Sequence, residues 1–168
     1  MNAMFTVETD MFEHRKVKAH FINPCCFGED FAGWLRNQLL TSPGFDFELS
    51  EPIQEDYGWG LWAFRNKERF WIALSYVGDG PQEPPAQWVI STTYDPGLNL
   101  IKRFFHRMDK GSLQRLRDWV REIVTSNSAI RVVPNPQIRV ERAGCATCSF
   151  HTVSIVGSFD SCIRPRSE

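Results

Sequence analysis

Two aromatic-rich runs that lie close together constrain the fold of this chain more than any other feature. They cover residues 57–64 and 69–77, and a short charged break from Arg65 to Glu68 separates them. Two apolar runs around such a break predict a β-hairpin. Because side chains alternate along a strand, each run has apolar residues on both faces, with Trp59 on one face and Trp62 on the other. A strand that is apolar on both faces is covered on both sides or lines a cavity, so we expect the hairpin in the middle of a single sheet.

Two glycines interrupt the first run. Gly58 and Gly60 flank Trp59 and share the face of Trp62. Glycine weakens the interior of a strand unless a neighbour approaches closely or the strand bends. The glycines therefore indicate either a bulge or room for a neighbouring aromatic ring, or alternatively a ligand slot floored by the glycines.

The segments around the hairpin predict an α+β fold. Alternation marks four further strands, at residues 15–22, 45–49, 87–94 and 130–133. Helical spacing marks three helices, which begin near Glu29, Asp95 and Ser112. Runs of strands followed by helices are typical of α+β proteins, so we expect a mainly antiparallel sheet of about five to six strands with three helices packed against it.

The same patterns divide the chain into three parts. Residues 1–13 show little periodicity and predict a flexible N-terminal arm, and residues 14–134 predict a single α+β domain. The C-terminal tail, residues 135–168, is expected to add edge strands or to be partly disordered. A stretch dense in glycine and proline, Gly78 to Pro85, predicts a long loop that is a candidate lid.

Charge and hydropathy exclude some classes of protein. The chain has 168 residues and a formal net charge of −1. No apolar run approaches the ~20 residues that a membrane-spanning helix needs, and residues 1–13 do not have the pattern of a secretory signal. We therefore expect a cytoplasmic protein with no membrane partner, and the composition leaves its oligomeric state open.

Basic residues gather in the region of the two late helices. They are Lys102, Arg103, Arg107, Lys110, Arg115, Arg117 and Arg121. Such a patch could meet nucleic acid, but no helix-turn-helix spacing or RNA-binding aromatic motif accompanies it. The charged, solvated side of two amphipathic helices is the favoured interpretation, and a nucleic-acid partner is not expected.

An acidic cluster lies just before and at the start of the hairpin. It consists of Asp46, Glu48, Glu51, Glu55 and Asp56. Glu55 and Asp56 stand at the mouth of the hairpin, beside Tyr57 and Trp59. Carboxylates next to aromatic surface can be desolvated, which raises their pKa and suits acid–base chemistry. They could also receive a cationic ligand or a basic partner peptide, or be a solvated strand end that prevents edge-to-edge pairing.

The tail contains a possible metal site. Cys145 and Cys148 form a C-x-x-C pair, and His151 and Cys162 could complete the four ligands that zinc prefers. A redox pair and incidental thiols are the alternatives. Near the other end of the chain, Cys25 and Cys26 are adjacent, and burial as small apolar residues is the favoured interpretation.

The segment Glu55-Asp56-Tyr57-Gly58-Trp59, with Phe70-Trp71-Ile72 after it, resembles a motif of small uncharacterised bacterial proteins. The resemblance covers a minor part of the chain and implies no activity.

The sequence as a whole favours a non-catalytic binding or regulatory module without a cofactor. The expected binding residues are Glu55, Asp56, Tyr57, Trp59 and Trp88, which would hold a protein partner or a small-molecule ligand. One alternative is a small enzyme that uses Asp56 or Glu55 as acid or base. A further alternative is a protein whose C-terminal tail is stabilised by zinc.

Overall fold

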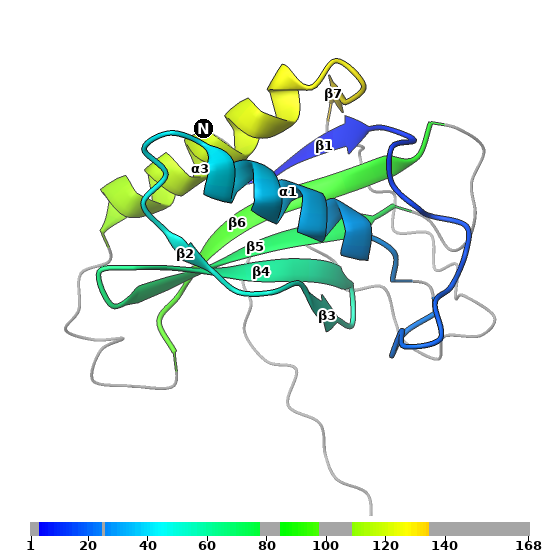
Figure 1. The fold of residues 1–168 in the computed structure, drawn as a ribbon, viewed down its shortest axis with the longest axis horizontal. Coiled ribbons are helices and arrows are strands. Elements are labelled where there is room, and N and C mark those ends of the chain that lie inside the picture. The colour runs from blue at the N-terminus through cyan, green and yellow to red at the C-terminus, as the bar shows by residue number, and fades with distance from the viewer. Residues whose placement is uncertain (1–3, 25, 78–84, 98–108, 135–168) are drawn as a thin grey trace, which may run out of the picture.

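The computed structural model describes residues 4–24, 26–77, 85–97 and 109–134. Their strands form one seven-stranded sheet with antiparallel pairing throughout. The strands are β1 (Met4–Glu8), β2 (Glu48–Leu49), β3 (Ile53–Glu55), β4 (Gly58–Arg65), β5 (Glu68–Tyr76), β6 (Gln87–Asp95) and β7 (Arg131–Val133). Their order across the sheet is β2-β4-β5-β6-β1-β7, and β3 also pairs with β4. The helices α1 (Glu29–Thr41) and α3 (Lys110–Ser126) lie over the same face of the sheet (Figure 1).

This architecture confirms the predicted α+β class and the mainly antiparallel sheet. The numbers of elements differ, because the described residues hold seven strands where about five to six are expected, and two helices where three are expected. The helix expected after Asp95 falls on residues 98–108, outside the described part of the chain. Most of the loop expected at residues 78–85 and the whole tail, residues 135–168, also lie outside it. Neither described helix has the length and apolar character that crossing a membrane requires.

The predicted hairpin is confirmed as β4 and β5. The two strands pair from Trp59 opposite Leu74 to Arg65 opposite Glu68. The turn residues Asn66 and Lys67 have φ values of 52° and 65°. Positive φ at both central residues is the geometry of a type I′ turn, whose twist matches that of the strands that it joins. Both strands lie inside the sheet, because β2 and β3 flank β4 and β6 flanks β5.

The N-terminal residues differ from the expected flexible arm. Residues 4–8 form β1, which lies between β6 and β7. Phe5 pairs with Ile90 of β6, and Val7 pairs with Val132 of β7. Phe5 and Val7 are both buried, since their alternate positions point into the core. The alternation covers only five residues, too few for the sequence pattern to reveal the strand.

Residues 15–22, expected to form a strand, belong instead to the loop that connects β1 to α1. The apolar half of the alternating pattern is not uniformly buried: Val17 is exposed, whereas Phe21 packs against Phe27 and Trp59. Contacts with the side chains of Glu29 on α1 and Gln54 on β3 hold this loop in place.

Both helices bury the apolar stripe that the sequence predicts. On α1, Phe31, Leu35 and Leu39 are fully buried, and on α3 Leu116 and Val120 are. These side chains pack on the sheet face that carries Leu61, Ile72 and Leu74, where they form one core cluster. The Asp109 side chain caps α3 by accepting a hydrogen bond from the Gly111 amide at 2.8 Å.

Candidate functional site

The hairpin mouth, which we define as Glu55, Asp56 and Tyr57, is the tight turn from β3 into β4. Glu55 is the last residue of β3 and pairs with Gly58, the first residue of β4. Gly58 has a φ of 150°, and a Cβ atom at this position would lie 2.2 Å from the carbonyl oxygen of Leu74. The close approach of the neighbouring strand therefore requires glycine here. The turn holds two carboxylates and a phenol within three consecutive residues.

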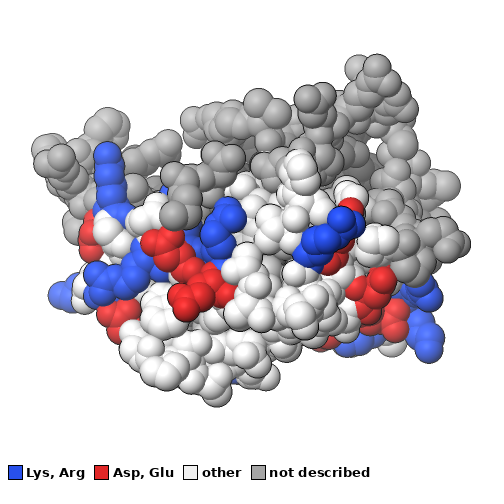
Figure 2. Space-filling view, turned by 90° about the horizontal axis from the view of Figure 1, so that it is seen from above, with Lys and Arg blue, Asp and Glu red and all other residues white. Residues whose placement is uncertain are grey.

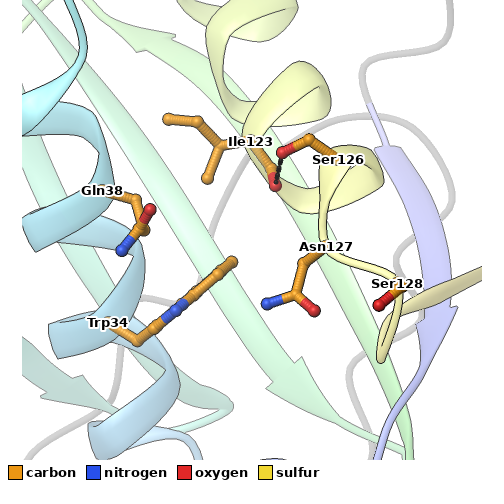
Figure 3. Close-up of a pocket in the computed structure, with 6 residues that line it drawn as sticks. All are labelled: Trp34, Gln38, Ile123, Ser126, Asn127 and Ser128. Carbon is orange, nitrogen blue, oxygen red and sulfur yellow. Dashed lines mark hydrogen bonds between the residues drawn. The ribbon is translucent and has the colours of Figure 1, made fainter.

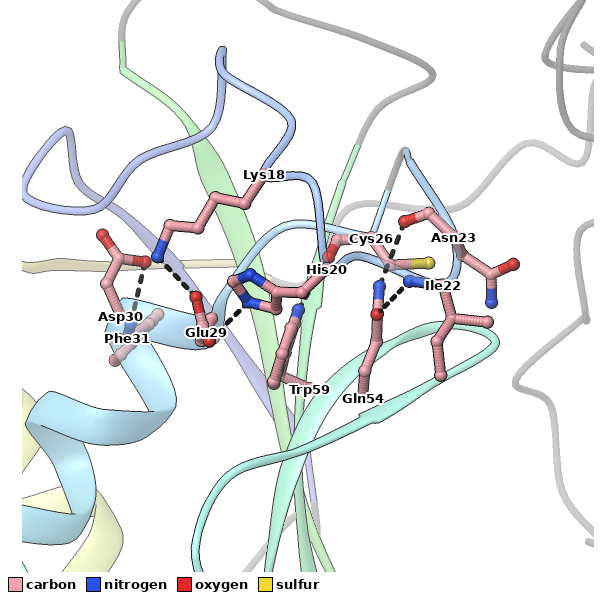
Figure 4. A network of polar contacts seen from close by, with 10 residues as sticks. All are labelled: Lys18, His20, Ile22, Asn23, Cys26, Glu29, Asp30, Phe31, Gln54 and Trp59. Atoms are coloured by element: carbon pink, nitrogen blue, oxygen red, sulfur yellow. Dashed lines mark hydrogen bonds and ion pairs between the residues drawn. The ribbon is translucent and has the colours of Figure 1, made fainter.

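The loop before α1 is fastened to this turn by hydrogen bonds between residues far apart in the sequence (Figure 4). The Ile22 amide donates to Oε1 of Gln54 at 2.7 Å, and Nε2 of Gln54 donates to the Asn23 carbonyl at 3.0 Å. Nδ2 of Asn23 donates to Oδ1 of Asp56 at 3.1 Å. These contacts hold the Gln54 side chain of β3, next to the mouth, and one oxygen of Asp56.

The two carboxylates of the mouth influence each other. Glu55 is half-buried, whereas Asp56 is exposed. Burial raises the pKa of Glu55 above its ordinary value, and the negative charge of Asp56 raises it further. The ionised pair is therefore costly in the absence of a positive charge.

Among the described residues, two other carboxylates of the acidic cluster, unlike those of the mouth, form ion pairs with arginine. Asp46 pairs with Arg65 at 2.8 Å, and Glu51 pairs with Arg36 at 2.7 Å. No such ion pair joins either carboxylate of the mouth to another residue in the described part of the chain. Within the acidic cluster, Asp46 and Glu51 have arginine partners, whereas Glu48 and the two carboxylates at the mouth have none in the described part of the chain. The mouth differs from the exposed Glu48 in that its two carboxylates are adjacent and one of them is half-buried.

Tyr57 ties the mouth to the sheet face opposite the helices. Its hydroxyl oxygen accepts a hydrogen bond from Nε1 of Trp71 at 2.7 Å. Burial raises the pKa of Tyr57 to about 12, which the hydrogen bond from Trp71 opposes and nearby Glu55 reinforces. A Cβ atom at Gly60 would lie 2.2 Å from the Trp71 ring. Gly60 therefore makes room for a neighbouring aromatic ring, which is one of the two interpretations of the glycines. The Trp71 ring fills the space that a ligand would need in the other interpretation.

The two tryptophans expected at the mouth lie elsewhere. Trp88 is fully buried, and Trp59 is almost fully buried. Nε1 of Trp88 donates to the Thr9 carbonyl at 3.3 Å, and Nε1 of Trp59 donates to the Cys26 carbonyl at 2.8 Å. Both rings belong to the core cluster on the helix-covered face. The candidate binding surface therefore narrows to Glu55, Asp56 and Tyr57.

A second polar cluster, which the sequence analysis does not identify, lies on the other side of Trp59. Lys18 and His20 both contact Glu29 in the first turn of α1 (Figure 4). Nε2 of His20 lies 2.8 Å from Oε1 of Glu29, and the His20 ring meets the Trp59 ring edge-on at 6.4 Å. Burial alone would raise the pKa of Glu29, but the hydrogen bonds from Lys18 and His20 outweigh burial and lower it. This carboxylate is already neutralised by its neighbours.

Cys26 lies between the two clusters. Its thiol donates to the Asp56 carbonyl at 3.3 Å. Burial raises the pKa of Cys26 to about 11, and the charge of Asp56 contributes to the rise. Because the thiolate is the reactive form, a thiol that stays protonated at neutral pH is a poor nucleophile. Cys26 is half-buried rather than fully buried as expected, and its hydrogen-bonded thiol gives it a structural role, while Cys25 lies outside the described residues.

The basic residues of the late helices do not form one positive surface in the part of the chain that is described. Arg115 lies 3.7 Å from Asp46, and Arg117 donates through Nε and Nη2 to the Thr92 carbonyl. Figure 2 shows acidic and basic side chains interspersed on the face seen from above. The expected basic residues at 102, 103 and 107 lie outside the described ranges.

Metal ligation is not evident among the described residues, which contain no group of three or more potential ligands placed to hold an ion. The zinc ligands proposed from the sequence, Cys145, Cys148, His151 and Cys162, all fall in the tail beyond residue 134.

No family model, curated protein or solved structure matches the chain. The chemistry of the site therefore has to be argued from its own geometry. That geometry offers a pair of carboxylates that have no ion-pair partner among the described residues, beside a phenol on a turn held by hydrogen bonds. Such an arrangement suits a positively charged group.

Proposed function

We propose that the protein is a non-catalytic binding module whose hairpin mouth accepts a positively charged group of a partner protein or small ligand. The observation that carries this proposal is a pair of adjacent carboxylates without an ion-pair partner among the described residues, one of which has its pKa raised by burial and by the charge of the other. Asp46 and Glu51 have arginine partners, whereas Glu55 and Asp56 have none among the described residues. A bound cation would offset the burial and the repulsion from Asp56 that together raise the pKa of Glu55.

The hydrogen bonds that hold the side chains of the mouth support binding. Ordering a flexible loop costs free energy that is lost from the affinity, whereas a preformed site avoids that cost. Asn23 holds Asp56, and Trp71 holds Tyr57, before any ligand arrives. A positive group that approaches this turn therefore meets fixed carboxylate and phenol oxygens.

Titration with short capped peptides tests the proposal. We expect peptides rich in arginine or lysine to shift the amide resonances of Glu55 and Asp56 in a saturable manner, and matched glutamine peptides to leave them unchanged. Protonation of Glu55 competes with a cation, so affinity should fall as the pH drops through the raised pKa of this residue. Affinity should also fall with added salt, because the site is partly exposed to solvent.

Charge-neutral variants localise the effect. Glu55→Gln and Asp56→Asn should each weaken binding by about tenfold or less, since each removes one partly screened charge. Glu48→Gln is the matched control, because it makes the same charge change at an exposed position of β2. Equal losses in all three variants, or no binding by any basic peptide, would contradict the proposal.

The raised pKa of Glu55 also favours a second candidate, a small enzyme with this carboxyl group or Asp56 as acid or base. The two candidates differ in one measurable property. In an enzyme, the wild type turns over a bound substrate and either Glu55→Gln or Asp56→Asn abolishes turnover, whereas a binding module shows no turnover with any of these side chains. Incubation of the wild type and these variants with cationic esters and amides, followed by mass spectrometry, separates the two candidates.

A zinc-stabilised tail is a separate proposal that rests on the spacing of Cys145, Cys148, His151 and Cys162. Elemental analysis of the purified full chain should give about one zinc per chain, and the Cys145→Ser/Cys148→Ser double variant should lose it. Metal-free protein after purification in the presence of zinc would remove this proposal.

A further inference from the structure

A polar pocket of about 380 Å³ opens between α1 and the C-terminal end of α3 (Figure 3). It is lined by Trp34, Gln38, Ile123, Ser126, Asn127 and Ser128. Its volume lies in the lower part of the range of ligand sites, which begins near 300 Å³. The pocket shares no residue with the hairpin mouth.

The lining consists of uncharged hydrogen-bonding groups. Oδ1 of Asn127 accepts from the Ala129 amide at 3.0 Å, which orients the side chain and leaves its NH2 group available. No hydrogen bond is recorded, within the described residues, for the Gln38 side-chain amide, the indole N–H of Trp34 or the Ser128 hydroxyl. Together these groups offer both donors and acceptors.

The wall on the α1 side is held in place by the core. The Trp34 ring packs at 5.5 Å from the Phe12 ring and 5.9 Å from the Phe31 ring. Gln38 lies one helical turn further along α1, so its side chain extends over the same face as Trp34. Figure 3 shows both side chains directed toward the end of α3 that carries Asn127.

The electrostatics of the pocket disfavour anions and offer a cation only the partial charge of the helix end. The last carbonyl groups of a helix give its C-terminal end a partial negative charge, which disfavours anions. The last turn of α3 has no basic residue to offset this charge. No carboxylate lines the pocket, so a cation would find no ionised partner there.

We propose that this pocket binds a neutral, hydroxyl-rich molecule of monosaccharide size. Each sugar hydroxyl can donate and accept at once, and the amides of Gln38 and Asn127 offer both functions on neighbouring atoms. The site is independent of the proposed function at the hairpin mouth, because the two differ in location, residues and ligand charge.

Nuclear magnetic resonance titration of the full chain tests the proposal. The probes are glucose, galactose, mannose and N-acetylglucosamine, with sodium acetate as the anionic comparison. We expect at least one sugar to shift the indole N–H resonance of Trp34 and the side-chain NH2 resonances of Gln38 and Asn127 in a saturable manner. A ligand of this size in an open pocket should have a dissociation constant of about 1–10 mM.

Two variants and a control complete the experiment. Gln38→Ala and Trp34→Phe should each weaken the affinity by about fivefold or more, since each removes a donor while the helix is kept. Asn37→Ala changes the adjacent exposed residue outside the pocket and should leave the affinity unchanged. The proposal is overturned by an absence of saturable shifts at about 100 mM sugar, by binding that both variants leave intact, or by pocket shifts with acetate alone.

Discussion

The two faces of the β4–β5 hairpin carry similar apolar side chains in very different surroundings. On the face covered by α1 and α3, Leu61, Ile72 and Leu74 are fully buried in the core cluster. On the opposite face, Trp71 packs against Trp62 with ring centroids 4.7 Å apart and donates a hydrogen bond to Tyr57. The first face contributes stability through burial, whereas the second also positions a polar turn. An apolar strand face can therefore serve the site as well as the core.

The largest expected effect is on the helix-covered face. Ile72→Ala should lower the free energy of unfolding by about 2–5 kcal/mol, because it leaves a cavity in a closely packed core. Chemical denaturation measures the loss. Ile53→Ala is the control, because this side chain is 37% exposed on β3, and it should cost less than about 1 kcal/mol. Equal losses in both variants would mean that the covered face is not the main source of stability.

A smaller effect is expected where the opposite face is tightly packed. Gly60→Ala places a methyl group against the Trp71 ring and the Ile72 carbonyl, which should cost about 1–3 kcal/mol. Thermal unfolding of the variant checks this value. Gly33→Ala is the matched control on α1, where a Cβ atom meets no neighbour within 4 Å. This control should raise stability by about 0.5–1 kcal/mol, because alanine favours helix more than glycine does.

The hydrogen bond between Trp71 on that face and Tyr57 at the mouth should contribute less to stability than the packing at Gly60. Tyr57→Phe leaves the indole N–H of Trp71 without its acceptor and should cost about 1–2 kcal/mol in urea unfolding. Tyr94→Phe should cost less than about 0.5 kcal/mol, since no hydrogen bond of the Tyr94 hydroxyl is recorded with a described residue. If both variants lose the same amount, the Tyr57–Trp71 contact does not stabilise the fold.

The smallest effect concerns the mouth and has the opposite sign. The raised pKa of Glu55 means that the folded state disfavours its charge. The wild type therefore gains stability below the ordinary glutamate pKa and loses this gain as the pH rises through the raised value. Glu55→Gln should increase stability at pH 7 by a few tenths of a kcal/mol, because solvent screens the site. The gain should vanish near pH 3.5, where the carboxyl group is protonated in both states. A loss of stability at pH 7 would contradict the cause assigned to the pKa shift.

Much of the fold can be predicted from the sequence because local patterns match the structure. The hairpin follows from two apolar runs around Asn66 and Lys67, and α1 and α3 follow from apolar stripes at helical spacing. The strand β1 could not be predicted from local alternation, because it is short and its partners β6 and β7 lie far along the chain. Residues 15–22 are wrongly predicted as a strand, because their side chains alternate between apolar and polar although the segment forms a loop.

The candidate site was predictable only where its residues are adjacent in the sequence. Glu55, Asp56 and Tyr57 follow one another, so their proximity needs no tertiary information. The contact of Lys18 and His20 with Glu29 depends on how the loop folds over α1, which no local spacing specifies. The burial of Trp59 and Trp88 likewise depends on which sheet face the helices cover. Alternation identifies two faces but does not say which one receives the helices.

The position of β1 has a consequence for how the chain folds. In the described part of the sheet, β7 is joined to the rest only through β1, and β1 itself pairs with β6, as in the contact between Glu8 and Gln87, 79 positions apart. Closing so long a loop is entropically costly and slows the formation of a sheet. The edge of the sheet formed by β1 and β7 should therefore assemble last, after β6 has paired with β5.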